Sequence, residues 1–140
     1  KKFKVMLFDT GIHQQVMKLD ISKYMVTDNF DIINKGSLAE VFTGLELLHA
    51  QSPLLREPLF YWLRESRGSN AEVDYVIQKD GRIIPIEVKA GTKESMQSMF
   101  LFLKEKNVKR GVRVSLENFN SVGNIDIVPL YAVDRVGQGV

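Results

Sequence analysis

The sequence of 140 residues contains no cysteine. Disulfide bonds, thiolate metal sites and thiol redox chemistry are therefore excluded, which fits a reducing cytoplasm. Histidine is scarce, because His13 and His49 are the only two, and no Gly-x-Ser-x-Gly motif marks a nucleophile for acyl transfer. No apolar run reaches the length of a membrane-spanning helix, and no signal peptide is visible. We therefore expect a cytoplasmic protein without a membrane partner.

The composition is that of an ordinary globular chain, with 44% hydrophobic and 26% charged residues. A chain of this length is expected to form a single domain over residues 1–140. The formal net charge of +2 is compatible with binding to nucleic acid without indicating it. Because the chain begins with Lys1 and Lys2 rather than with Met, we expect it to be a piece of a longer polypeptide.

Hydrophobic periodicity and turn residues predict the order of helices and strands. The expected elements are a strand over 1–8, a short helix over 12–19, a helix over 37–50, a strand over 59–65, a hairpin over 71–90, a helix over 92–107, and strands over 111–116 and 127–133. Ser37 and Thr92 are the expected N-caps, and Glu40 completes a capping box with Ser37. The order predicts an α/β fold in which an antiparallel meander continues through a helix into a parallel strand. We expect a mixed sheet with helices on both faces.

The hairpin over 71–90 contains the strongest local signal, Asp80-Gly81 between two runs of alternating apolar residues. A two-residue turn there makes Lys79 face Arg82, and the same register makes Asp74 face Glu87 across the strands. One face of the hairpin then carries the charged side chains, Glu72, Asp74, Glu87 and Lys89. The other carries the apolar ones, Val73, Tyr75, Ile84, Ile86 and Val88.

The predicted pairing of Asp74 with Glu87 is electrostatically unfavourable, because two carboxylates directly opposite each other repel. Protonation of one carboxylate, an intervening cationic side chain or a bound divalent metal would each relieve the repulsion. Lys89 lies on the same face, and its positive charge relieves part of this repulsion. A hard divalent cation bound by both carboxylates would relieve it more fully.

Glu40 on the helix, Asp74 on the second strand and Glu87-Val88-Lys89 on the third resemble the signature of the PD-(D/E)xK nuclease superfamily. Val73 stands where that signature often has Pro. The resemblance implies a restriction-endonuclease-like fold with an αβββαβ core. It also implies a metal-dependent nuclease that hydrolyses phosphodiester bonds in DNA.

A narrower resemblance covers nearly the whole chain. It is carried by short motifs that are similar to the C-terminal domain of a family of prokaryotic AAA-type ATPases: Gly36-x-x-x-Glu40-x-Phe42, Tyr61-Trp62, Glu72-Val73-Asp74 and the run Ile84-Pro85-Ile86-Glu87-Val88-Lys89-Ala90-Gly91. The resemblance implies a core over residues 36–134 and an N-terminal ATPase domain in the same polypeptide. This segment has no Walker-type glycine loop of its own.

The superfamily resemblance implies a role for each site residue. Asp74 and Glu87 would bind Mg²⁺ or Mn²⁺ together with the carbonyl of Val88 and water. Glu40 would hold a metal-bound water or a second metal. Lys89 would stabilise charge on the phosphate and help to orient or deprotonate the attacking water.

Each of these residues also has a structural interpretation. The four charged side chains of the hairpin can form a solvated ladder, and the capping box explains Glu40 without a metal. Glu72 is expected to pair with Lys89 or with solvent. The basic side chains near the turns, Arg64, Arg67 and Lys93, can reach phosphates or remain solvated. The alternative function is a non-catalytic module that binds nucleic acid or a partner and regulates an attached ATPase.

Overall fold

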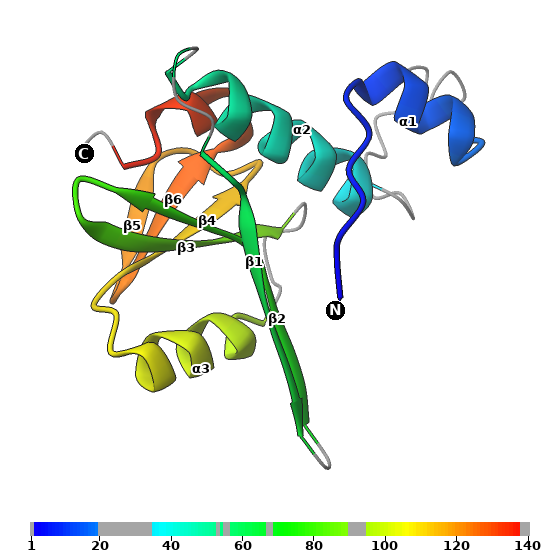
Figure 1. Cartoon of the computed structure of the whole chain (residues 1–140). Helices are drawn as coiled ribbons and strands as arrows, with labels where there is room; N and C mark the ends of the chain where they lie inside the picture. The colour runs from blue at the N-terminus through cyan, green and yellow to red at the C-terminus, as the bar shows by residue number, and fades with distance from the viewer. Residues whose placement is uncertain are drawn as a thin grey trace.

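The computed structural model describes residues 2–19, 35–52, 54, 57–66, 69–89 and 95–137 (Figure 1). The elements in chain order are α1 (Thr10–Val16), α2 (Lys35–His49), β1 (Phe60–Ser66), β2 (Ser69–Lys79), β3 (Arg82–Lys89), α3 (Gln97–Lys106), β4 (Gly111–Ser115), β5 (Asn120–Val122), β6 (Ile125–Pro129) and the 3₁₀ helix η2 (Leu130–Arg135).

Six strands form one mixed sheet in the order β1-β2-β3-β4-β6-β5. The strand β2 runs antiparallel to both β1 and β3, whereas β4 is parallel to both β3 and β6, and β5 is antiparallel to β6. The helix α3 joins the parallel pair β3 and β4, as the sequence predicts. The α/β fold with a mixed sheet is therefore confirmed.

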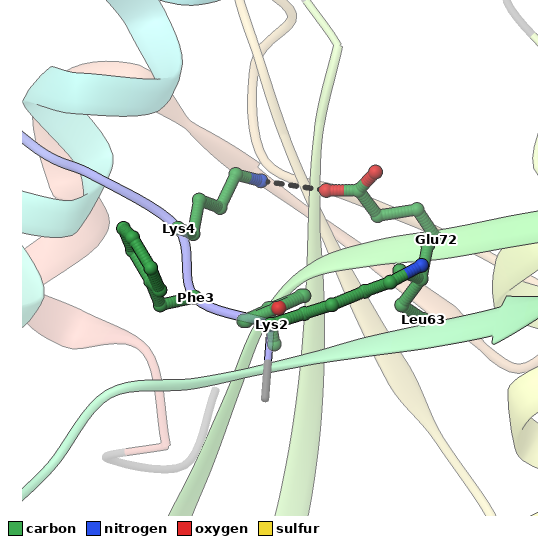
Figure 2. A pocket seen from close by; sticks show the side chains of 6 residues that line it. Lys2, Phe3, Lys4, Leu63 and Glu72 are labelled. Carbon is green, nitrogen blue, oxygen red and sulfur yellow. Dashed lines mark hydrogen bonds and ion pairs between the residues drawn. The ribbon is translucent and has the colours of Figure 1, made fainter.

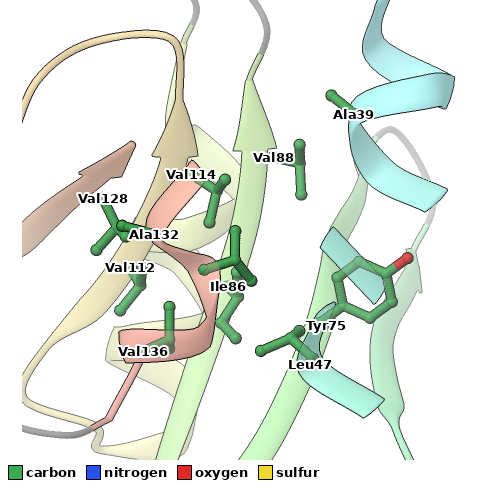
Figure 3. Packing of buried hydrophobic residues seen from close by; sticks show 11 residues of the cluster. Ala39, Leu47, Tyr75, Ile86, Val88, Val112, Val114, Val128, Ala132 and Val136 are labelled. Atoms are coloured by element: carbon green, nitrogen blue, oxygen red, sulfur yellow. The ribbon is translucent and has the colours of Figure 1, made fainter. Parts of the chain in front are cut away.

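The sheet carries a hydrophobic core on each face. On one face α2 and η2 cover the strands (Figure 3), with buried residues that include Leu47, Ile86 and Val114. On the other face α3 buries Met99 and Phe102 against the sheet. The ring of Phe102 meets that of Trp62 edge to face, with centroids 5.3 Å apart, so the partly buried Trp62 packs against this core. The prediction of helices on both faces is confirmed.

The hairpin forms with the predicted turn and register. Asp80 and Gly81 both have positive φ, 50° and 72°, as the tightest hairpin turns require. The ladder then runs from Lys79 opposite Arg82 to Tyr75 opposite Ile86. Within the described residues the pairing of β2 with β3 ends there, and the first half of β2 pairs with β1 alone.

A β-bulge lies in β2 where the strand changes its partner. Phe60 pairs with Val76 and Trp62 with Val73, so two residues of β2, Asp74 and Tyr75, oppose a single residue of β1. Such an extra residue reverses the alternation of side chains beyond it. Val73 accordingly lies in the α3 core and Tyr75 in the α2 core. The prediction that these two share a face was wrong, because strict alternation ignores the bulge.

Both predicted helix starts were also wrong. The helix α2 begins at Lys35, so Ser37 lies inside it, and its hydroxyl lies 3.1 Å from Nε2 of His13 on α1. The helix α3 begins at Gln97 after Met96, and Thr92 falls outside the described residues. The capping box that offered a structural role for Glu40 is therefore not formed.

The two ends of the chain differ from the expectation as well. Residues 2–8 are described but form no strand, and Phe3 and Val5 are largely exposed. Near the other end, the loop expected over 117–124 contains the short strand β5. The last strand, β6, stops at Pro129, where the chain turns into η2. In the part of the chain that the structure describes, no helix has the length and apolar character needed to cross a membrane.

Close packing of α2 on the sheet depends on Gly44. A Cβ atom at this position would lie 2.3 Å from Sδ of Met6 and 2.5 Å from the hydroxyl oxygen of Tyr75. The missing side chain leaves room for Tyr75, whose hydroxyl donates to the backbone carbonyl of Glu40 at 2.8 Å. This contact fixes α2 against the bulge of β2, and it brings Glu40 close to the strand that carries Asp74.

Candidate functional site

The candidate site lies where β2 leaves β3. Asp74 sits in the bulge of β2, and its Oδ2 accepts a hydrogen bond of 2.8 Å from the backbone N–H of Val88 on β3. The Asp74 carboxylate thus accepts a hydrogen bond from a backbone N–H of β3 at the point where the pairing of β2 with β3 ends. This contact holds Asp74 against the Glu87-Val88-Lys89 run. The predicted ladder pairing of Asp74 with Glu87 is not formed among the described residues, because the pairing of β2 with β3 ends at Tyr75 and Ile86.

Glu87 is the most deeply buried acid of the site, with 4% of its surface exposed. Its Oε1 lies 3.1 Å from Nζ of Lys89, and its Oε2 is buried without a hydrogen-bond partner among the described residues. Burial raises the pKa of Glu87; Lys89 and a hydrogen bond from the backbone of Met99 oppose this rise, and the charge of Asp74 adds to it. An unsatisfied carboxylate oxygen of this kind is costly and is uncommon in folded proteins.

On the side of Asp74 that faces α2, the N-terminal segment contributes Lys4, a residue that the sequence interpretation missed. Its ammonium lies 2.5 Å from Oε1 of Glu40, 2.9 Å from Oε1 of Glu72 and 3.4 Å from Oδ1 of Asp74. The same ammonium stands 5.8 Å from the centre of the Tyr75 ring. The expectation that Glu72 pairs with Lys89 or solvent therefore needs correction, since its ionic partner is Lys4.

The titration of Lys4 and Glu40 reflects this contact. Burial alone would lower the pKa of Lys4, but hydrogen bonds to Glu40 and Glu72 and the charge of Asp74 together raise it. Burial raises the pKa of Glu40, and the hydrogen bond from Lys4 only partly offsets this. Lys4 is thus held as a cation among three acidic groups.

No local pattern in the sequence marks Lys4, because it lies 36 residues before Glu40 and 70 before Asp74. The only signal available was the excess of negative charge at the site, which requires some cation nearby. The sequence does not say which of the 19 Lys and Arg residues supplies it.

A shallow pocket opens beside this cluster, between the N-terminal segment and β1–β2 (Figure 2). It is lined by Lys2, Phe3, Lys4, Tyr61, Leu63 and Glu72. Figure 2 shows the ion pair of Lys4 and Glu72 across it. The pocket is therefore bordered by Lys4 and by one of its acidic partners, Glu72.

Whether these residues suit a divalent metal depends on which carboxylates are counted. No group of three His, Cys, Asp or Glu side chains positioned to hold a metal ion occurs among the described residues. Glu40 in particular is engaged by Lys4. Asp74 and Glu87 supply two carboxylates, and a metal such as Mg²⁺ is commonly bound by one or two carboxylates together with water and substrate phosphate. The unpartnered Oε2 of Glu87 supplies a donor atom for it.

The remaining candidate residues are distributed around this centre. Arg64 pairs with Glu105 of α3 at 3.0 Å, so its guanidinium serves the structure in this arrangement. Arg67 and Lys93 fall outside the described residues. The carbonyl of Val88 as a metal ligand stays a prediction. Arg113 of β4 pairs in register with Glu87 and is also buried.

With this geometry in view, comparison with known proteins identifies the family. The chain matches the family described as a domain of unknown function, DUF4143, over residues 35–133. Because the match covers most of the chain, the protein belongs to this family. Neither the comparison with curated proteins nor the comparison with solved structures found a match.

Proposed function

We propose that this domain is a metal-dependent nuclease of the PD-(D/E)xK type that hydrolyses phosphodiester bonds in DNA. The observation that carries the proposal is the convergence of three groups where β2 leaves β3: Asp74 bonded to the backbone of Val88, the buried Glu87 and Lys89 beside it. Two acids and a lysine at the divergence of two strands suit a reaction in which negative charge develops on a phosphate.

Each residue has a role that follows from its surroundings. Asp74 and Glu87 would hold Mg²⁺ or Mn²⁺, with Glu87 offering its unpartnered oxygen. When bound, the metal would polarise the phosphate and lower the pKa of a bound water. Lys89 places a positive charge beside the reacting phosphate. Glu40 has a supporting role, because its carboxylate is bound to Lys4.

The resemblance to the C-terminal domain of AAA-type ATPases supports a cytoplasmic setting for this activity. In that setting an ATPase domain of the same polypeptide would deliver or remodel the DNA on which this domain acts. This context is part of the proposal and extends beyond membership of the DUF4143 family.

Cleavage of DNA tests the proposal. Supercoiled and linear DNA are incubated with the protein in Mg²⁺, in Mn²⁺ and in EDTA, and the products are resolved on gels. We expect metal-dependent nicking that Asp74→Asn and Lys89→Met each reduce by roughly 100-fold or more. Asp126→Asn serves as the matched control, since Asp126 pairs with Arg110 elsewhere on the sheet. Cleavage that survives both site variants would contradict the assignment.

A second candidate, a non-catalytic module that binds nucleic acid or a partner, is favoured by one observation. Lys4 already supplies a cation to Glu40, Glu72 and Asp74, so those acids need no metal for stability. Gel-shift assays at several salt concentrations distinguish the two candidates. Steep salt dependence without cleavage, unchanged in Asp74→Asn, would favour the binding module.

A further inference from the structure

The N-terminal segment, residues 2–8, reaches the candidate site through side chains rather than through a sheet. Lys2 pairs with Glu65 on β1, and Lys4 reaches the acids of α2 and β2. Met6 fills the space above Gly44, and its sulfur lies 3.7 Å from the Tyr75 hydroxyl. Phe3 and Val5, between these anchors, are exposed at 81% and 74%, and Phe8, just after them, at 78%. A few side-chain contacts therefore account for the docking of this segment.

The charge of Lys4 is well placed to substitute for a metal. Its ammonium contacts one oxygen of Asp74, the carboxylate that also touches the backbone of Val88 and raises the pKa of Glu87. An ammonium at this point relieves the repulsion among the acids, as a divalent ion would. The two cations would contend for the charge of the same Asp74 carboxylate.

We propose that Lys4 is a tethered counter-cation that competes with the divalent metal, so that loading of the metal at Asp74 and Glu87 releases Lys4 and the N-terminal segment. The competition rests on the proposed function, because it presupposes a bound metal. The contacts of Lys4 with the acids do not depend on the proposed function. The segment would thus keep the site stable but closed until a metal, with its phosphate substrate, replaces the ammonium.

Removing the charge of Lys4 tests this proposal. The wild type is compared with Lys4→Met, with the charge-preserving Lys4→Arg and with Lys2→Met, a control on the same segment whose partner is Glu65. In EDTA, Lys4→Met should melt at a lower temperature than the other three proteins, because Glu40, Glu72 and Asp74 then repel without a cation. Mn²⁺ should close this gap.

Calorimetric titration of Mn²⁺ gives the second readout. Lys4→Met should bind Mn²⁺ roughly tenfold more tightly than wild type, the effect of removing about one charge-assisted contact. In wild type, acylation of the Lys4 amine, followed by mass spectrometry, should speed up when Mn²⁺ is added. Acylation of Lys2 serves as the internal reference and should not change.

The outcomes separate this inference from the proposed function. If Asp74→Asn abolishes Mn²⁺ binding but Lys4→Met changes neither stability in EDTA nor Mn²⁺ affinity, the metal site stands and the competition is overturned. Unchanged acylation of Lys4 at saturating Mn²⁺ would overturn it equally. If wild type and Lys4→Met both fail to bind Mn²⁺, the competition and the metal-dependent nuclease fail together.

Discussion

Two charged clusters on the same sheet differ in how completely their polar groups are satisfied. At the start of β4 and β6, Asp126 accepts hydrogen bonds from Arg110 Nε at 3.0 Å and from Ser121 Oγ at 3.0 Å, and Arg110 lowers its pKa. At the candidate site Glu87 is buried with one unpartnered oxygen, and burial raises its pKa. The satisfied cluster serves the fold, whereas the unsatisfied cluster is the arrangement expected of a binding or catalytic site.

The largest expected effect comes from Glu87→Gln. The variant should lose Mn²⁺ binding and reduce any cleavage by roughly 100-fold. At pH 7 its free energy of unfolding should rise, because the negative charge whose pKa is raised by burial is removed. Metal titration, cleavage assays and thermal unfolding measure the three quantities. A variant that keeps its cleavage rate, or unfolds much more easily, would mean that Glu87 serves the stability of the fold and not metal binding.

The next largest effect is expected from a substitution that disturbs the packing around the site. Gly44→Ala forces a methyl group against Tyr75 and Met6 and should destabilise the protein by about 1–3 kcal/mol. The matched control is Gly36→Ala on the same helix, where an added Cβ meets nothing within 4 Å. That control should stabilise by up to about 1 kcal/mol, since alanine favours a helix over glycine. Denaturant unfolding curves compare the two, and equal effects would disprove the close approach at Gly44.

The smallest effects should appear in the pH dependence of stability, with opposite signs at the two clusters. The pKa of Glu87 is raised above its usual 4.5, so the gain of Glu87→Gln over wild type should be fully present at neutral pH. The gain should shrink as the pH falls through the raised pKa toward 4.5. The pKa of Asp126 is lowered from 3.8, so Asp126→Asn should show a small loss above that pH which fades below it.

Thermal unfolding of both variants between pH 3 and pH 7 checks this contrast. The Arg110–Asp126 pair is partly exposed, and screening keeps its contribution small. Parallel curves for the two variants would mean that the clusters do not differ in the way described.

The parts of the fold that follow from local sequence were predictable. The Asp80-Gly81 turn predicted the hairpin and its register as far as the pair of Tyr75 and Ile86. Periodicity located α2, and the apolar run before Gly111 indicated a helix crossing between parallel strands. These features depend on residues close together in the chain, and that is why one sequence was enough to find them.

The features that were missed depend on contacts between distant parts of the chain. The bulge at Asp74 and Tyr75 lies where β2 leaves β3 while it stays paired with β1, and no residue type in the sequence marks this position. Lys4 lies in a segment that was expected to form a strand, whereas the structure holds it by side chains alone. Lys4, which contacts three acids at the site, thus lies outside every motif found in the sequence.

Calorimetric titration of Mn²⁺ into wild type, Asp74→Asn and Asp126→Asn tests the central claim most directly. A paired-carboxylate site predicts binding to one site in wild type and in Asp126→Asn, and loss of binding in Asp74→Asn while the protein remains folded. Absence of binding in wild type, or equal binding by all three proteins, would contradict a metal site at Asp74 and Glu87.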